Sequence, residues 1–349
     1  MELFNFCGSH FEVGQAIGKT FRQQIRRTLA NNADLQDTFL PFHHTPEGKR
    51  KYQRLIQLHR LRFPQYFSEL EGISQGAGVS FEELFLVNMR GEYQIYVRRS
   101  KDFECSTCSL LTADQALFAH NEDGSSIYHG QMCLVRIEVP RKPAFIALCY
   151  PGFLPGNAFG FNSNGICFSA NSILPKGTVT GLGRHFIARS LFEARSLEEA
   201  VKLATTPGRA SGFNYTIGSL KERRIINLEV SPSTYRLLEV KGSFFHANHY
   251  IRLTEVDQLI TLSSRSRQKR GEMILAEGLT KDKKGVLKVL RDHKVKDYPI
   301  LRDGRPPDSG VTLVTALFDL DSKRLTIYPG GKRRPKQRFK PLIEIPMTQ

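Results

Sequence analysis

The chain has 349 residues, of which 40% are apolar and 24% charged. This composition is typical of a globular protein with a sizeable core and excludes a disordered or collagen-like chain. Its 50 Lys and Arg residues exceed its 34 Asp and Glu residues by 16, and this positive charge favours an anionic partner without specifying one. Six cysteines are too few for a disulfide framework at this length, so we expect free thiols in a reducing compartment.

Neither a targeting signal nor a membrane span is expected. Residues 1–7 lack a basic segment and a sustained apolar run. The longest apolar run, 144–150, is less than half as long as a bilayer span requires. We therefore predict a cytoplasmic protein.

The first third of the chain is predicted to be helical. Apolar residues that recur every four positions mark one face of an amphipathic helix, namely Ile17, Phe21, Ile25 and Leu29. A second helix is predicted over 50–62, ended by Pro64. Ser80 and Glu83 fit a capping box that opens a third helix, which runs to about Glu92.

Beyond residue 100 the apolar period changes to two, which indicates half-buried strands over 135–139 and 226–230. Further strands are predicted over 311–318 and 323–329. Helices are predicted near 187–194, 197–204, 265–278 and 282–292. Many strands with interspersed helix pairs favour layered sheets covered by helices, in one domain.

Two short motifs are weak signals of function. Gly14 and Gly18 lie in a segment that resembles a phosphate-binding loop, but three residues separate them where the loop needs four. Cys105 and Cys108 form one CxxC pair, and a zinc site would need a second pair of ligands. A redox pair would need a helix after the first cysteine, whereas the residues that follow favour a strand. A CxxC thiol protein is kept as a third alternative.

Cys105 opens a predicted hairpin whose return strand, 116–123, ends at Asp123. This hairpin would bring Asp123 back near the cysteine. A carboxylate close to a thiol discourages thiolate formation, because like charges compete. The arrangement makes chemical sense if Cys105 also carries a free α-amino group, which titrates near about 7.7 and can deprotonate its own thiol.

With these residues the sequence resembles the acyl-coenzyme A:6-aminopenicillanate acyltransferase-like peptidases (family C45), which are N-terminal nucleophile (Ntn) hydrolases. The hairpin of Cys105 and Asp123 is similar to the family's nucleophile hairpin, and similar motifs follow in the family's order along nearly the whole chain. They are Gly160-Phe161-Asn162-Ser163-Asn164-Gly165, Phe245-His246-Ala247-Asn248-His249-Tyr250 and Ser264-Arg265-Ser266-Arg267.

The resemblance implies an α+β fold, a four-layer αββα sandwich of two antiparallel sheets flanked by helices. It implies one domain over 1–349, in which 1–104 is a helical N-terminal segment and 105–349 is the catalytic segment. The chain would cleave itself before Cys105, so that the two segments become separate polypeptides.

The resemblance also assigns roles to four residues. Cys105 would attack an amide or thioester carbonyl and form an acyl-enzyme. Asn248 would donate to the oxyanion, an interaction typically worth about 3 kcal/mol. Asp123 would orient the α-amino group, and Arg267 would lie near both carboxylate and sulfur. The expected substrate is a small-molecule amide or an acyl thioester. We expect no cofactor, no metal and no specific nucleic-acid partner, and we make no prediction of oligomeric state.

One departure from the family keeps a second reading open. The family commonly has Gly before the nucleophile, and here the residue is Glu104. Glycine tolerates strained backbone more freely, and an uncleaved Cys105 would lose its base. The alternative is therefore a non-catalytic or uncleaved Ntn-fold protein that binds an anionic ligand. Glu104 and the positive net charge both favour this alternative. Basic stretches at 98–101, 221–224 and 332–338 are interpreted as solvated surface or as a means of steering such a ligand.

Overall fold

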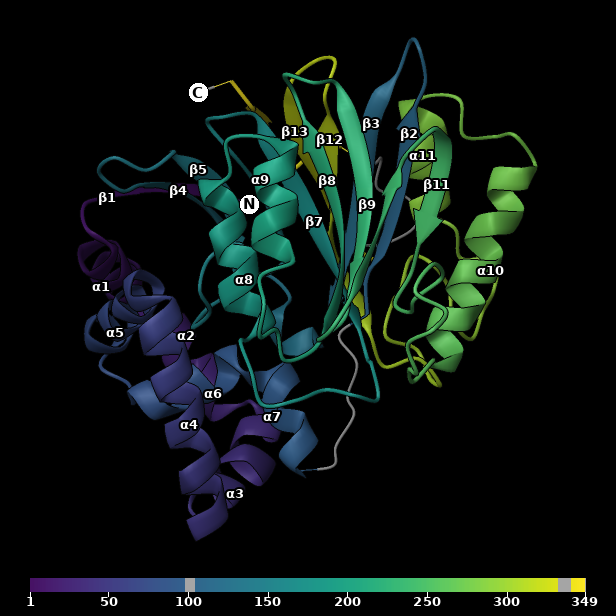
Figure 1. Ribbon diagram of the computed structural model, residues 1–349. Coiled ribbons are helices and arrows are strands. Elements are labelled where there is room, and N and C mark those ends of the chain that lie inside the picture. Colours follow the sequence, from purple (N-terminus) through teal and green to yellow (C-terminus); the bar gives the residue numbers. More distant parts are fainter. Residues whose placement is uncertain (98–103, 332–339, 349) are drawn as a thin grey trace.

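The computed structural model describes residues 1–97, 104–331 and 340–348. Its core is two stacked β-sheets with helices on both outer faces (Figure 1). One sheet has eight strands in the order β1-β4-β5-β6-β7-β8-β9-β10, and the other has six in the order β11-β2-β3-β12-β13-β14. The expected α+β sandwich of αββα type is confirmed, except that β1 pairs with β4 in parallel.

The strand bounds are as follows. The eight-stranded sheet contains β1 (Leu3–Cys7), β4 (Cys133–Glu138), β5 (Phe145–Cys149), β6 (Phe159–Asn162), β7 (Ile166–Ile173), β8 (Gly212–Ser219), β9 (Arg224–Val230) and β10 (Tyr235–Glu239). The six-stranded sheet contains β11 (Gly242–His246), β2 (Ser106–Leu111), β3 (Ala116–Gly124), β12 (Val311–Asp319), β13 (Arg324–Pro329) and β14 (Ile343–Pro346).

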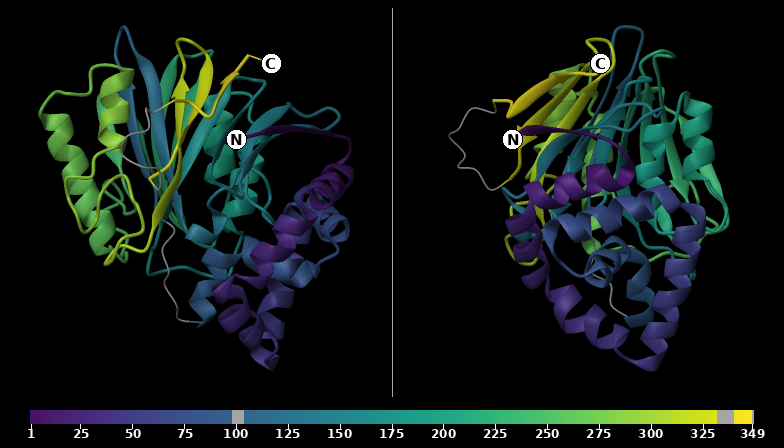
Figure 2. Two further views of the ribbon diagram at one scale, coloured as in Figure 1. Left: turned by 180° about the vertical axis from the view of Figure 1, so that it is seen from behind. Right: turned by 90° about the vertical axis from the view of Figure 1, so that its left-hand side faces the viewer.

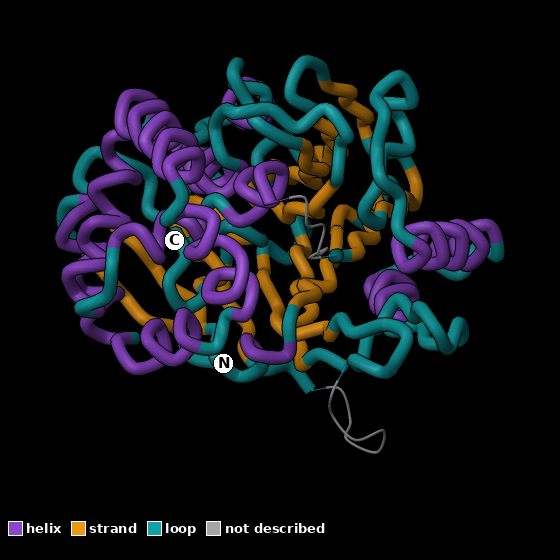
Figure 3. Tube along the Cα trace, turned by 90° about the horizontal axis from the view of Figure 1, so that it is seen from below, coloured by secondary structure: helices purple, strands orange, loops and turns teal. Residues whose placement is uncertain are grey.

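The helices form three groups. α8 (Arg184–Ser190) and α9 (Leu197–Ala204) cover the eight-stranded sheet, whereas α10 (Leu262–Ala276) and α11 (Lys283–Leu290) cover the six-stranded sheet. Seen from below, the strands lie between helices on two sides (Figure 3). The N-terminal helices gather at one end of the sandwich (Figure 2). They are α1 (His10–Thr20), α2 (Arg22–Ala30), α3 (Leu40–His43), α4 (Pro46–Arg62), α5 (Pro64–Ala77), α6 (Phe81–Asn88) and α7 (Arg90–Val97), with the π-helix η1 (Leu35–Phe39) between α2 and α3.

The predicted helical third is correct in type and wrong in its boundaries. The first predicted helix is broken at Phe21, whose φ of −106° and ψ of 23° separate α1 from α2. Pro64 does end α4, but it also begins α5, because proline suits the first position of a helix, where its missing N–H is not needed. The third predicted helix divides into α6 and α7, and Ser80 caps α6 by accepting from the N–H of Glu82.

The Gly14–Gly18 segment is a helix-packing surface. A Cβ on Gly14 would lie 1.9 Å from the carbonyl oxygen of Glu69, and one on Gly18 would lie 2.4 Å from that of Ile73. The two glycines therefore let the backbones of α1 and α5 come into contact, and this segment is a helix surface and not a phosphate-binding loop.

Buried ion pairs join the N-terminal helices to the sandwich. Arg189 of α8 donates to both carboxylate oxygens of Glu69 on α5, at 3.1 and 2.8 Å. Arg184 of α8 donates to Glu92 of α7 at 2.9 Å. The carboxylates and guanidinium groups of these pairs are almost completely buried. The N-terminal helices and the sandwich contribute side chains to one buried apolar cluster.

Two of the three basic stretches, 98–101 and 332–338, lie outside the described residues. In the third, Arg223 pairs with Asp321, and Arg224 pairs with Glu222 and Glu239, all at the surface. No helix in the described part of the chain is long and apolar enough to cross a bilayer.

Candidate active site

The predicted hairpin is present and places Cys105 at its open end. Strands β2 and β3 pair in the register Ser106↔Asn121 and Thr107↔His120. Because Cys105 directly precedes the first pair, the residue across from it is Glu122. The Sγ of Cys105 lies 3.5 Å from Oε2 of Glu122, and the cysteine is 5% exposed.

Glu122 and Asp123 follow each other in β3, so their side chains point to opposite faces of the sheet. Glu122 faces the space between the sheets and contacts the sulfur, whereas Asp123 lies on the side of Arg302, with 3.8 Å between Oδ2 and the guanidinium. The hairpin does return Asp123 to the vicinity of Cys105, but the carboxylate nearest the sulfur is one that the sequence analysis did not single out. A register count across the predicted hairpin would have found it.

The same alternation separates Cys105 from Cys108. Cys108 is fully buried in a cluster of apolar side chains between the six-stranded sheet and helices α10 and α11, among them Leu110 and Ile274. The CxxC alternative is therefore not supported, because the two sulfurs point to opposite faces of one strand. All six cysteines lie in the described residues and are free.

Side chains hold three backbone atoms of residues 104 and 105, two of which belong to the peptide bond between them. The N–H of Cys105 donates to Oδ1 of Asn248 at 2.9 Å. Arg302 donates to the carbonyl oxygen of Glu104 at 3.3 Å, and Arg267 donates to that of Cys105 at 2.8 Å. The predicted residues Asn248 and Arg267 are thus brought together with Cys105, and Arg302 joins them from the loop between α11 and β12.

The side chain of Glu104 is buried among cationic and hydroxyl groups. Its carboxylate accepts from Arg267 at 3.0 Å and from the hydroxyl of Thr261, and Arg302 lies 3.5 Å away. Burial raises the pKa of the Glu104 carboxyl, but the two guanidinium groups outweigh it and hold the pKa below its ordinary value. Glu104 is therefore a charged residue in a site built for a carboxylate.

Burial is the largest influence on the pKa values of Asp123 and Cys105. Burial raises the pKa of Asp123 to about 7, against the opposing effect of the Arg302 and Arg267 charges. Burial, and then the negative charges of Glu122 and Asp123, raise the pKa of the Cys105 thiol well above its ordinary value. The thiol is thus protonated at neutral pH.

Asn248 is engaged through both ends of its amide. Its Oδ1 also accepts from Arg267 at 2.9 Å, and its Nδ2 donates to the carbonyl oxygen of Ser172 at 2.9 Å. The orientation of the amide is therefore fixed, and the N–H groups expected to meet an oxyanion lie on the side of β7.

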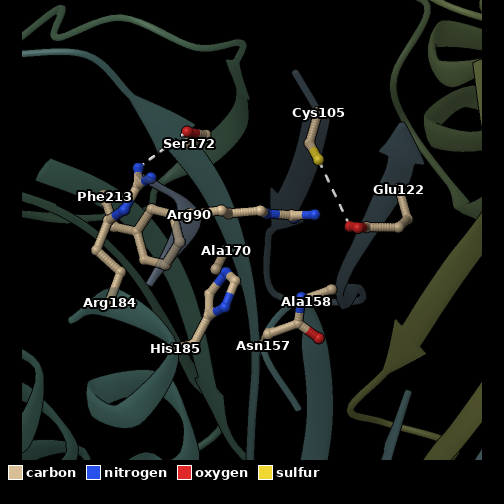
Figure 4. Close-up of a pocket in the computed structure, with 10 residues that line it drawn as sticks. All are labelled: Arg90, Cys105, Glu122, Asn157, Ala158, Ala170, Ser172, Arg184, His185 and Phe213. Carbon is tan, nitrogen blue, oxygen red and sulfur yellow. Dashed lines mark hydrogen bonds between the residues drawn. The ribbon is translucent and has the colours of Figure 1, made fainter. Parts of the chain in front are cut away.

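A small cavity of about 30 Å³ lies beside Cys105 and Glu122 (Figure 4). Its walls come from the start of α7, strands β7 and β8, and the first turn of α8, and combine polar with apolar side chains. The other lining residues are Arg90, Asn157, Ala158, Ala170, Ser172, Arg184, His185 and Phe213. A space of this size holds about two water molecules, so a larger ligand would require the lining side chains to move. None of these residues was predicted from the sequence as a ligand contact, because they come from five separate segments.

A sandwich of αββα type, with a buried cysteine at the start of an inner strand and a cavity beside its sulfur, defines the class to which Ntn hydrolases belong. Within that class, the family model of acyl-coenzyme A:6-aminopenicillanic acid acyl-transferase matches residues 110–334. The chain belongs to this family, and the resemblance found in the sequence is confirmed.

Two curated relatives are similar over most of their length. The chain is 28% identical over 352 residues to β-alanyl-dopamine/carcinine hydrolase of Drosophila melanogaster, covering 92% of this chain and 90% of the relative. It is 27% identical over 301 residues to the 40 kDa form of acyl-coenzyme A:6-aminopenicillanic-acid acyltransferase of Emericella nidulans, covering 84% and 83%.

Among solved structures, the fold is similar to an N-acylethanolamine-hydrolyzing acid amidase orthologue of Caenorhabditis elegans. The TM-score is 0.45 at 13% identity, over 62% of this chain and 92% of the other. Penicillin V acylase of Agrobacterium tumefaciens is similar with a TM-score of 0.40 at 12% identity, over 64% and 82%.

Proposed function

We propose that this protein is a cysteine amidohydrolase or acyltransferase for small-molecule amides, with Cys105 as nucleophile, and that it first cleaves its own chain before Cys105. The observation that carries the proposal is the Glu104–Cys105 peptide bond, which lies beside a cavity with Arg302 on its carbonyl oxygen and Asn248 on its N–H. These contacts orient the bond that would be broken and polarise the carbonyl that would be attacked.

In the self-cleavage step, the sulfur of Cys105 attacks the carbonyl carbon of Glu104. The C–N bond breaks, the nitrogen takes up the thiol proton, and a thioester joins the two segments. Water then hydrolyses the thioester, which leaves a carboxylate on Glu104, a thiol on Cys105 and a free α-amino group beside it. The donation from Arg302 to the Glu104 carbonyl supports this step, because a cation there stabilises the oxyanion that forms.

In turnover, the α-amino group of Cys105 takes the thiol proton, and the thiolate attacks the substrate carbonyl. The departing amine takes that proton as the C–N bond breaks. Asn248 is the proposed oxyanion donor, Asp123 orients the α-amino group, and Arg267 fixes the backbone of Cys105. Water or an amine acceptor then releases the acyl group, which distinguishes a hydrolase from an acyltransferase.

The relatives and the cavity together support a small amide as substrate. One relative is named for hydrolysis of β-alanyl-dopamine and carcinine, and the other for acyl transfer to 6-aminopenicillanic acid. Glu122 lines the cavity at the sulfur, and a carboxylate in that place suits an acyl group that carries an ammonium, such as β-alanyl. We therefore place β-alanyl amides first among substrates to test.

The proposal includes one domain over 1–349 with two segments, 1–104 and 105–349, and a cytoplasmic location, which suits six free thiols. The alternative is an uncleaved Ntn-fold protein that binds an anion in the cavity, and the guanidinium groups of Arg90 and Arg184 on its wall favour that reading.

The test is an assay of the purified full chain with carcinine and β-alanyl-dopamine, in which released β-alanine is measured. Wild type and Cys108→Ala are expected to release it, and Cys105→Ala is not. Transfer of an acyl group from acyl-coenzyme A to 6-aminopenicillanate is measured in parallel. A chain that processes none of these compounds and binds anions in the cavity would favour the alternative.

A further inference from the structure

Three side chains that could bind a metal ion converge at the candidate nucleophile. The Sγ of Cys105, Nε2 of His120 and an Oε atom of Glu122 all lie within 4.8 Å of one another, and all three residues are buried. Oε2 of Glu122 lies 3.5 Å from the sulfur and 3.0 Å from Nε2 of His120. We propose that this triad is a binding site for Zn²⁺, and that zinc held there inhibits the enzyme reversibly.

The two separations that involve Oε2 of Glu122 are close to those of a tetrahedral zinc ion, and Sγ of Cys105 lies within 4.8 Å of the imidazole ligand atom. Bond lengths of about 2.0 Å to nitrogen, 2.1 Å to oxygen and 2.3 Å to sulfur give tetrahedral edges of about 3.4 Å from nitrogen to oxygen and about 3.6 Å from sulfur to oxygen. The observed 3.5 Å between Sγ and Oε2 matches this geometry. The observed 3.0 Å between Nε2 and Oε2 would need to open by a few tenths of an ångström.

A chain of hydrogen bonds orients the imidazole as a metal ligand. Nδ2 of Asn171 donates to the carbonyl oxygen of His246 at 3.3 Å, so Oδ1 of Asn171 is an acceptor. Thr107 donates its hydroxyl proton to that Oδ1 at 2.8 Å. The hydroxyl oxygen of Thr107 must then accept from Nδ1–H of His120 at 2.9 Å. In the neutral imidazole, Nε2 is therefore the atom with the lone pair.

This tautomer leaves two acceptors facing each other, the lone pair of His120 and a carboxylate oxygen of Glu122. The pair requires a cation between its members, which is either a proton or a metal ion. Tyr150 donates to the other oxygen of Glu122, so both ligands have the supporting contacts that metal-binding side chains usually have.

The chemistry of the donors selects zinc. One thiolate, one imidazole and one carboxylate suit Zn²⁺ and provide too few oxygens for Ca²⁺ or Mg²⁺. The thiolate and the carboxylate together neutralise the ion, and binding releases the thiol proton. Because Cys105 and Glu122 line the cavity, the fourth position faces it and would take a water molecule.

Inhibition follows from the identity of one ligand. A sulfur that donates its electron pair to zinc is not available to attack a carbonyl, and the ion blocks the cavity end at which the carbonyl must lie. The binding claim itself does not depend on the proposed function, since it concerns the side chains alone.

The test is titration of the purified full chain with Zn²⁺ against a chelator of known affinity, with Co²⁺ as a spectroscopic probe. We expect one equivalent of zinc and a thiolate-to-cobalt absorption band. His120→Gln and Glu122→Gln should each weaken binding at least about tenfold, and Thr107→Val, which removes the contact that orients His120, by about tenfold or more. Cys108→Ala is the matched control and should bind like wild type.

A second measurement uses the unmodified chain and so does not depend on whether a variant folds. Zinc should slow the alkylation of Cys105 by iodoacetamide at least about tenfold, leave the exposed Cys7 unaffected, and be reversed by EDTA. The proposal is overturned if zinc does not protect Cys105, or if the His120 and Glu122 variants bind zinc as tightly as wild type. Absence of amide hydrolysis in a chain that shows these zinc effects would contradict the proposed function and leave the metal site in place.

Discussion

Arg267 donates to the carboxylate of Glu104 at 3.0 Å and, through its other terminal nitrogen, to the carbonyl oxygen of Cys105 at 2.8 Å. A single buried guanidinium thus holds both residues of the peptide bond that we propose is cleaved. The residue that departs from the family's usual glycine is therefore tied to the site by its charge.

This contact predicts that a positive charge at position 104 prevents self-cleavage. Glu104→Lys should abolish cleavage, because its ammonium would oppose Arg267 and Arg302. Glu104→Gly, which restores the family's usual residue, should still cleave. The cleaved fraction on a denaturing gel measures both, with Glu239→Lys at the surface as a control. Efficient cleavage of Glu104→Lys would contradict this prediction.

Arg302 is expected to stabilise the fold as well as the scissile carbonyl. It pairs with Asp308, lies 3.8 Å from Asp123 and is almost fully buried. Arg302→Met should lower the free energy of unfolding by about 3–5 kcal/mol, because it leaves buried carboxylates without their cation. Arg305→Met is the matched control, since the Arg305 side chain is 83% exposed and surface pairs contribute about 0–1 kcal/mol. Equal denaturation midpoints for the two variants would contradict this.

After cleavage, the segments 1–104 and 105–349 should stay together. The buried pair of Glu69 and Arg189 joins them, as does the pairing of β1 with β4. We expect the fragments to co-elute in size exclusion and to separate only in denaturant. Arg189→Met should lower the free energy of unfolding by about 3–5 kcal/mol, and Arg60→Met, at an exposed pair, by less than about 1 kcal/mol. Separation of the wild-type fragments in native buffer would be the contrary result.

The stability of the fold should fall as the pH falls from about 6.5 to about 4. His59 donates from Nδ1 to the carbonyl oxygen of Leu55 and accepts at Nε2 from the N–H of Gly183, which precedes α8. Burial lowers its pKa from 6.5 to about 4. The unfolded state therefore binds the proton first, and His59 contributes stability that is present above pH 6.5 and lost as the pH approaches 4, roughly 3 kcal/mol in all.

Denaturant unfolding at several pH values measures this dependence. His59→Gln should flatten the fall in the free energy of unfolding between pH 6.5 and 4, whereas His293→Gln, at an exposed position, should not. A slope that is the same in His59→Gln and wild type would rule His59 out as the source.

The parts of the fold with strong local patterns could be predicted from the sequence. The strand over 226–230 and the hairpin of Cys105 and Asp123 are both present. The prediction that the strand is half-buried is wrong, because Asn227 and Glu229 are buried as fully as the apolar residues between them. Proline at position 64 was ambiguous, since it both ends one helix and begins the next. The parallel pairing of β1 with β4 could not be predicted, because it joins strands more than a hundred residues apart.

In the candidate site, too, residues in local sequence patterns could be predicted, whereas a residue placed only by long-range packing could not. Asn248 and Arg267 were found through motifs, and Glu122 could have been found from strand register. Arg302 lies in an irregular loop without periodicity or motif, and only the packing of that loop against the hairpin brings it to the carbonyl of Glu104.

The central claim is most directly tested by intact mass spectrometry of the purified chain under denaturing conditions. The account predicts two masses, those of segments 1–104 and 105–349, for wild type and for Cys108→Ala, and a single full-length mass for Cys105→Ala. A wild-type chain that hydrolyses amides while showing only the full-length mass would contradict it.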